Sequence, residues 1–516
     1  MNHLRTFLML GSAMALVACG ADDVASPGEG TLVNSSTSSS STTSSTSTSS
    51  TSTGGTVYTG TAPAGFIDRG TLNGKRIFEM PTRFSADTTI QNLPGVVYSI
   101  SGPVNVGTDI GGDGSATGGT RVTLTVQPGV VFMASSGNDY LVVNRGSRIS
   151  AIGTASSPII FTARANIAGE TTETSQGLWG GIILLGRAPI SDCNTTVAGG
   201  TASCQNVVEG TTSSLYGGAT ADDNSGTMQY VQIKYSGFAI APGNELQGLT
   251  LGGVGSGTTI DHIQIHNSSD DGIEIFGGRA NLKYIVITGA DDDGLDTDLG
   301  YKGFIQFVIA AQRDASNGDS MVEADSNGNE DALPRQNTRL ANFTFVQRST
   351  TQGLNAMLLR GGTDYTMVNG VVVAPSGSAC LDIDETGGTT TRAANSALDD
   401  VGPPVFNSVV FSGCKPFQEE TPTANVTAAA IQSIFNAGTN NNSAFTSTLT
   451  QGFVNGANES AVTAFNASTL GSFFVNTGYI GAVRNSSDTW WSGWTCNSTT
   501  LTFAATSPNC ATAPTV

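Results

Sequence analysis

The sequence is poor in charge, and above all in basic residues. Of its 516 residues, 12% are Asp, Glu, Lys or Arg, and 41 acidic side chains against 22 basic ones give a formal net charge of −19. A surface of this sign repels phosphate backbones, so we expect no nucleic-acid partner. The shortage of charge, together with 65 glycines, is typical of a chain rich in strands and turns.

The sequence also lacks a hydrophobic run long enough to cross a bilayer. The short apolar stretch Phe7–Val17 follows Arg5, which is the pattern of a signal peptide over residues 1–18. The segment "LVAC" that ends at Cys19 resembles a bacterial lipobox, which implies that Cys19 carries fatty acids such as palmitate. Two or more acyl chains anchor a protein stably, and Gly20 resembles the outer-membrane type of lipoprotein. The alternative is an ordinary secretory signal with an incidental cysteine.

The segment after the lipobox lacks the means to form a core. Ser35 to Thr53 is an unbroken run of Ser and Thr, without an apolar side chain to bury. We therefore expect residues 19–56 to form a disordered tether that lifts the folded part away from the lipid.

Cysteines are few, and no CxxC spacing is present. If Cys19 is lipidated, six remain, an even number in an exported chain. Neighbouring cysteines flank short turn-rich stretches, which predicts three local disulfides that pin loops. Spacing alone leaves 15 pairings open for six cysteines. We expect the pairs Cys193/Cys204, Cys380/Cys414 and Cys496/Cys510.

Short strands separated by turn residues run through the middle of the chain, and two of them repeat. The stretch "NSSDDGIEIFGG" (Asn267–Gly278) returns 22 residues later as "GADDDGLDTDLG" (Gly289–Gly300). A fixed period of this length predicts a solenoid whose stacked coils share one core. The matched positions are Ile263/Ile285, Ile265/Ile287, Asp270/Asp292, Asp271/Asp293, Gly272/Gly294, Ile273/Leu295, Glu274/Asp296 and Gly278/Gly300.

Several longer segments carry a family resemblance. "GLWGGIILLGRAPI", "GLTLGGVGSGTTIDHIQIHNSSDDGIEIFGG", "DDDGLDTDLGYKGFIQFV" and "YIGAVRNSSDTWWSGWTC" resemble bacterial outer-membrane or surface lipoproteins with a right-handed parallel β-helix. The resemblance implies an all-β fold and a location on the cell surface, and it leaves the reaction open. We expect a cap at 57–120, the β-helix at 121–424 and a C-terminal cap region at 425–516. Within the last, Thr427–Gly438 is the best candidate for a helix.

The repeated aspartates suggest a cation site. Equivalent residues of successive coils stand about 4.8 Å apart, where like charges repel unless a cation, a proton or water intervenes. Calcium takes six to eight oxygen ligands, so acidic turns suit it. The alternatives are Asp-Gly turns in which Asp binds its own backbone, and a catalytic pair. The candidate calcium ligands are Asp270, Asp271, Asp291, Asp292, Asp293, Asp296 and Asp298.

Function is the least determined property of the sequence. A long solenoid side suits binding or adhesion, or accessory capture of a polysaccharide or an outer-membrane protein. Exposed Trp490, Trp491 and Trp494 would stack on sugar rings; alternatively they plug the end of the solenoid. The alternative function is a polysaccharide lyase or glycoside hydrolase, because β-helices host such enzymes, but fold alone does not establish it. We expect a binding protein.

Overall fold

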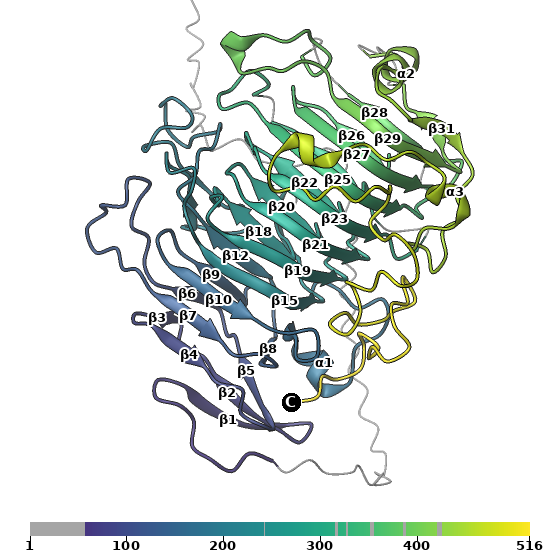
Figure 1. Cartoon of the computed structure of the whole chain (residues 1–516). Coiled ribbons are helices and arrows are strands. Elements are labelled where there is room, and N and C mark those ends of the chain that lie inside the picture. Colours follow the sequence, from purple (N-terminus) through teal and green to yellow (C-terminus); the bar gives the residue numbers. More distant parts are fainter. Residues whose placement is uncertain are drawn as a thin grey trace, which may run out of the picture.

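The chain folds into two long, mostly parallel β-sheets that enclose one core. The computed structural model describes residues 57–241, 243–314, 318–326, 329–350, 355–384, 389–419 and 426–516. The signal peptide, Cys19 and the tether lie outside these residues. The described part contains no helix long and apolar enough to span a membrane. The strands stack from the first coils to the last along one axis, so the prediction of an all-β parallel β-helix is confirmed (Figure 1).

Sheet A is the larger of the two, with 16 strands. They are β1 (Ile67–Leu72), β2 (Lys75–Glu79), β4 (Thr88–Ile90), β5 (Val96–Ser99), β7 (Thr123–Val126), β8 (Val131–Ala134), β10 (Arg148–Ile152), β11 (Ile159–Ala163), β15 (Gly226–Lys234), β19 (Thr259–His266), β21 (Asn281–Thr288), β23 (Phe304–Ala311), β25 (Asn337–Val346), β27 (Asp364–Val373), β29 (Val405–Ser412) and β31 (Asn442–Phe445).

Sheet B has 11 strands. They are β3 (Arg83–Phe84), β6 (Pro103–Val106), β9 (Tyr140–Val143), β12 (Ile182–Leu185), β18 (Leu249–Gly252), β20 (Ile273–Phe276), β22 (Leu295–Asp298), β24 (Val322–Ala324), β26 (Met357–Leu359), β28 (Ala379–Ile383) and β30 (Lys415–Phe417). Two hairpins stand apart from both sheets, β13 (Asn206–Val207) with β14 (Leu215–Tyr216), and β16 (Phe238–Ala241) with β17 (Asn244–Leu246). The helical segments are α1 (Arg164–Ala168), η1 (Ser396–Leu398), α2 (Ala428–Ala437), α3 (Ala457–Ser460) and η2 (Ala467–Leu470).

Each central coil crosses sheet B and then returns along sheet A. The 22-residue register predicted from sequence is confirmed on both sheets. Ile263 pairs with Ile285 between β19 and β21, and Glu274 pairs with Asp296 between β20 and β22. Period-two alternation directs the isoleucines of each strand into one shared core and the residues between them outward.

A column of left-handed residues bends every long strand of sheet A. Tyr230, His262, Tyr284 and Phe307 occupy equivalent positions on β15, β19, β21 and β23, with φ between 53° and 65°. Their rings stack at centroid distances of 4.3, 4.5 and 4.8 Å. The column continues with Asn342, Asn369 and Ser408 on β25, β27 and β29. The bend divides sheet A into two flat faces, so the coil has three sides.

The two ends of the core are closed by different means. Parallel pairing already begins with β2 and β5, well before residue 121, so the predicted N-terminal cap is largely part of the β-helix. Tyr58 and Phe66 pack against the first coil. At the other end, α2 lies within the predicted helix Thr427–Gly438, has Thr427 as its N-cap, and inserts Ile431 and Phe435 into the core. Helix α2 therefore covers the C-terminal end of the core.

The remainder of the predicted C-terminal cap does not lie at the end. Residues 446–516 run back along the outer face of sheet A towards α1, where the chain terminates (Figure 1). Glutamines that point outward from the strands bind this segment's backbone: Gln232 donates to Trp494 O and Gln306 to Val475 O, at 2.6 and 2.8 Å. The sequence could not show this, because the partners are more than 150 residues apart.

All three predicted disulfides are present. Cys193–Cys204 ties the excursion between β12 and β15, Cys380–Cys414 links two coils, and Cys496–Cys510 closes a loop in the returning segment.

Candidate functional site

An acidic row crosses the outer face of sheet B at its middle. In β20, Ile273 and Ile275 face the core, so alternation turns Glu274 outward. The strand register places Asp296 of β22 beside Glu274, and Glu323 of β24 beside Asp296. Three consecutive coils therefore present a carboxylate at the same height.

Three carboxylates converge at this row, and we call Asp271, Glu274 and Asp296 the acidic cluster. One carboxylate oxygen from each lies within 4.8 Å of the others. The three residues are buried, with exposed fractions of 6%, 3% and 1%. Carboxylates in such a position cost free energy unless protons or a cation compensate them.

Two oxygens of the acidic cluster have no partner among the described residues. Glu274 Oε2 and Asp296 Oδ1 are inaccessible to solvent and accept no hydrogen bond there. Buried polar atoms in proteins are nearly always satisfied, so two orphaned oxygens in one cluster of carboxylates indicate a missing partner. Sequence comparison had paired Glu274 with Asp296, but Glu274 was not among the predicted ligands.

Burial and mutual repulsion raise the pKa of each carboxyl group in the cluster. For Asp271 the causes are burial and then the charge of Asp270; for Glu274 they are burial and then Glu209. The pKa of Asp296 is raised by burial and by Asp298. These shifts favour a cluster that is protonated or compensated by a bound cation.

Several predicted ligands, Asp271 of the acidic cluster among them, also accept hydrogen bonds from the backbone. Asp271 Oδ1 accepts from Asp293 N at 2.9 Å, and Asp293 Oδ1 accepts from Ser320 N at 2.6 Å. Asp298 Oδ1 accepts from Asp325 N at 3.0 Å. These aspartates bind the backbone of the next coil, whereas the predicted turn would have bound its own.

Asp270, Asp291 and Asp292 lie outside the acidic cluster. Asp270 accepts from Gln247, and Asp291 faces Gln176 and Arg313. Asp292 is only half-buried, and its backbone oxygen accepts from Asp319 N. Of the seven predicted ligands, only Asp271 and Asp296 belong to the cluster, because the turn sends adjacent aspartates in different directions.

The acidic row ends at an arginine that belongs to a later coil. Arg360 pairs with Glu323 and with Asp325. Burial opposes the charge of Arg360, but Glu323 and Asp325 outweigh it and raise the pKa of the guanidinium. This ion-pair group was missed in the sequence, because insertions of different length separate its coils.

The excursion after β12 borders the acidic cluster on its N-terminal side. It packs Tyr216 and Val208 over outward apolar residues of sheet B, including Ile183 and Phe276. Gln247 donates both to Glu209 of this excursion and to Asp270. The cluster thus lies where an apolar cover gives way to an acidic face.

The tryptophans do not offer an exposed stacking surface. Trp494 is fully buried against Tyr230 and His262, and Trp491 is 5% exposed against Phe453. Trp490 is half-buried and donates Nε1–H to Ala482 O at 3.1 Å. They cover the side of sheet A, so neither the predicted sugar platform nor a plug at the end describes them.

Comparison with known proteins gives one match. A family model described as a pectate-lyase-like β-helix domain matches residues 112–495, which is most of the chain. No curated protein and no solved structure matches.

Proposed function

Because the chain belongs to the pectate-lyase-like β-helix family, we propose that it binds a polysaccharide and holds a divalent cation, Ca²⁺, at the acidic cluster. The observation that carries the cation is the pair of orphaned oxygens on Glu274 and Asp296. Calcium is coordinated by oxygen alone, commonly by carboxylates and water, and it would relieve the repulsion among three buried carboxylates. A bound Ca²⁺ would also attract the carboxylates of an acidic sugar polymer.

Binding is favoured over cleavage by the state of the neighbouring base. A lyase must remove a proton from carbon, so its base must be deprotonated at working pH. Arg360 is held in ion pairs that raise its pKa, so it stays charged and cannot accept that proton. The second candidate function is a polysaccharide lyase, and the observation in its favour is the match to the pectate-lyase-like family.

Calorimetric titration of the EDTA-treated protein with CaCl₂ tests the cation. We expect one site in the wild type, and no heat of binding in Glu274→Gln or Asp296→Asn. Glu170→Gln is the matched control, because Glu170 is acidic and exposed. Ca²⁺ uptake that persists in both cluster variants, or no uptake by the wild type at millimolar Ca²⁺, would refute the site.

A panel of pectin, alginate and neutral glucans tests the ligand. We expect retention on an acidic polymer with Ca²⁺ present and weaker retention in EDTA. Release of unsaturated ends would establish the lyase instead. If no polymer retains the protein and none is cleaved by it, polysaccharide binding is refuted.

We infer further that the folded part is displayed on the outer membrane by a lipid on Cys19. The lipobox-like "LVAC" and the Ser/Thr run support this. Labelled palmitate should enter the wild type and be absent from Cys19→Ser, which should be released into the soluble fraction. Equal labelling of the two proteins would contradict the anchor.

A further inference from the structure

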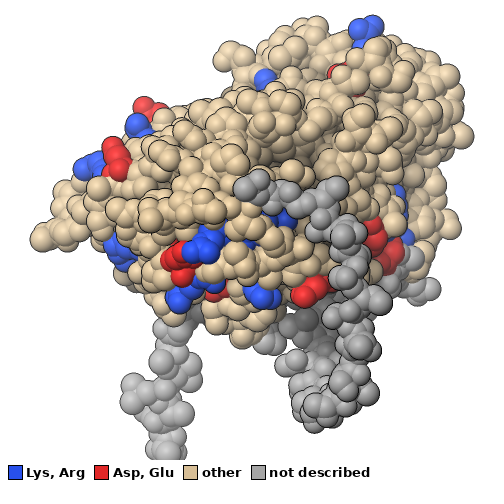
Figure 2. Space-filling view, turned by 90° about the horizontal axis from the view of Figure 1, so that it is seen from below, with Lys and Arg blue, Asp and Glu red and all other residues tan. Residues whose placement is uncertain are grey.

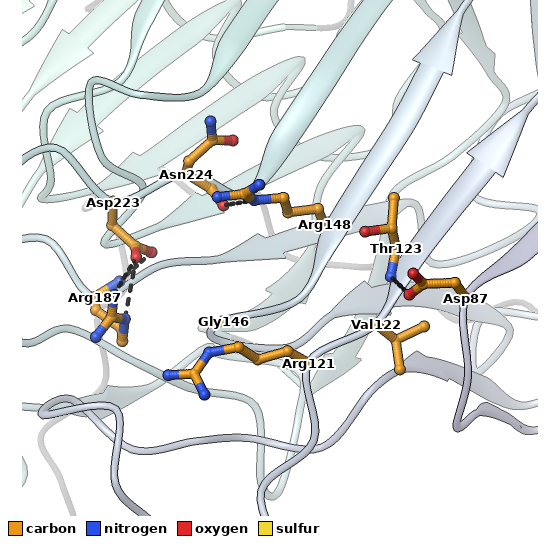
Figure 3. Close-up of a pocket in the computed structure, with 9 residues that line it drawn as sticks. All are labelled: Asp87, Arg121, Val122, Thr123, Gly146, Arg148, Arg187, Asp223 and Asn224. Atoms are coloured by element: carbon orange, nitrogen blue, oxygen red, sulfur yellow. Dashed lines mark hydrogen bonds and ion pairs between the residues drawn. The ribbon is translucent and has the colours of Figure 1, made fainter.

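A basic pocket lies at the corner where the early coils pass from sheet B to sheet A. It has a volume of about 340 Å³ and is lined by Asp87, Arg121, Val122, Thr123, Gly146, Arg148, Arg187, Asp223 and Asn224. Arg121 precedes β7, Arg148 opens β10 and Arg187 follows β12. Three successive coils therefore each contribute a guanidinium group, and the side chains of Arg121 and Arg148 extend towards Arg187 and Asp223 (Figure 3).

The three arginines differ in what holds them. Arg187 is fixed by Asp223, with Nε and Nη2 donating to Oδ1 at 3.0 and 2.9 Å. Arg148 donates Nε–H to the backbone oxygen of Asn224 at 3.2 Å, and Arg121 donates to Gly114 O at 3.2 Å. Within the described ranges, neither Arg121 nor Arg148 forms an ion pair. Both line the pocket and retain N–H donors that these hydrogen bonds do not use.

Two of the positive charges approach the same point. A Cβ atom on Gly114 would stand 2.7 Å from Nη1 of Arg187 and 3.3 Å from Nη2 of Arg121. Asp223 already offsets the charge of Arg187, so an anion beside these guanidinium groups would offset the charge of Arg121. On the face seen from below, charged side chains are sparse and gather in a few small groups (Figure 2).

We propose that this pocket binds the carboxylate of a sugar acid, as found in an acidic polysaccharide. The inference rests on the proposed polysaccharide binding and adds a second contact, independent of the cation. Guanidinium groups recognise carboxylates through paired N–H donors. The cavity lies at the small end of ligand pockets and has room for one sugar unit.

The charge balance selects a singly charged ligand. Asp223 neutralises Arg187, and Asp87 accepts from Thr123 N at 2.8 Å at the rim. Three arginines against these two aspartates leave one positive charge, which matches a carboxylate better than a doubly charged phosphate or sulfate ion. Neutral sugars lack the group that would complete the site.

Saturation-transfer NMR on the whole folded protein in EDTA tests the pocket, with galacturonate, galactose and inorganic sulfate as probes. We expect galacturonate to bind and galactose to bind at least about tenfold more weakly, since a charge-assisted pair contributes more than 1.4 kcal/mol. The double substitution Arg121→Gln/Arg148→Gln should weaken galacturonate by about tenfold or more. Both arginines are exposed, so the fold should survive, which circular dichroism checks.

Arg484→Gln is the control, because Arg484 is exposed and outside the pocket lining. Unchanged galacturonate binding in the double variant would overturn the proposal, as would equal binding of galactose. Sulfate that binds more tightly than galacturonate would also overturn it. EDTA removes any contribution of a cation at the acidic cluster, so the two sites are tested separately. If no polymer retains the wild type, the proposed function is refuted. Arginine-dependent binding of galacturonate would still support the pocket.

Discussion

At the residue scale, the acidic cluster destabilises the folded protein when no cation is bound. Burial and repulsion raise the pKa of Glu274, so its charged form is disfavoured in the folded protein. Glu274→Gln keeps the shape and removes the charge. In EDTA at pH 7 we expect it to increase the free energy of unfolding, because the neutral amide removes a carboxylate whose charge is costly to bury. Chemical denaturation measures this.

Calcium should reverse that order. Added Ca²⁺ should stabilise the wild type and leave Glu274→Gln unchanged, because a ligand stabilises only the state that binds it. The control is again Glu170→Gln, which should follow the wild type in both conditions. A variant that is less stable than the wild type in EDTA would show that the carboxylate at 274 stabilises the fold by itself.

Lys234 is a second buried charge, and its cost should depend on pH. Burial lowers the pKa of its ammonium group to about 7, and Nζ donates to Cys510 O at 3.0 Å. It faces Tyr235 and His266; burial and the charge of Lys234 lower the pKa of His266 to about 3, so that ring is neutral. The unfolded chain therefore holds a proton on Lys234 between pH 7 and about 10.4 that the folded chain lacks.

Stability attributable to Lys234 must accordingly rise with pH through that window, by up to about 1.4 kcal/mol per pH unit. Lys234→Met removes the titrating group. We expect the variant to exceed the wild type in free energy of unfolding by the largest amount below pH 7. This difference should shrink between pH 7 and 10, as measured by denaturant unfolding at several pH values. A constant difference across this range would contradict a lowered pKa.

At the element scale, the bend column explains how a long strand serves two faces of a coil. Asn342 has φ of 55° and donates to Tyr479 O at 2.9 Å, so it joins the bend to the returning segment. Asn342→Ala should destabilise the fold by about 2 to 4 kcal/mol, because Ala tolerates the left-handed conformation less well than Asn and cannot form the hydrogen bonds. Asn342→Gly relaxes the backbone and loses only the hydrogen bonds, so its loss should be smaller. Equal losses would mean that the bend carries no strain.

The elements also show where sequence reasoning succeeds. Ile263 with Ile285 and Glu274 with Asp296 could be paired because no insertion separates their coils. Thr427 and Gly438 mark α2 through local chemistry alone, and Thr427 Oγ1 accepts from Ala430 N at 3.2 Å. Glu323, by contrast, stands 27 residues after Asp296 and escaped the 22-residue comparison. The helix and the strand register could be predicted from local signals and a constant period. The position of Glu323 could not, because insertions of variable length separate its coil from the preceding one.

At the scale of the whole molecule, the returning segment is part of the β-helix and not an appendage. It covers outward apolar residues of sheet A, among them Val286, Ile309 and Val371. Leaving such a face uncovered would expose it to water and to other chains. Trp494 was misplaced by sequence reasoning for this reason, since its partners Tyr230 and His262 lie far upstream.

Cys496–Cys510 should determine how firmly the end of this segment stays attached. Within or beside its loop, Cys496 N donates to Gln264 at 2.8 Å and Cys510 O accepts from Lys234. Replacing both cysteines with serine should lower local stability by roughly 3 kcal/mol, as expected for a loop of this length. Limited proteolysis should then cut between residues 485 and 516 while the coils stay intact. The matched variant Cys193→Ser/Cys204→Ser opens the excursion over sheet B instead and should leave this segment protected. If the segment stays uncut in Cys496→Ser/Cys510→Ser, then sheet A and not the disulfide holds it in place. If it is cut alike in both variants, its attachment does not depend on this disulfide in particular.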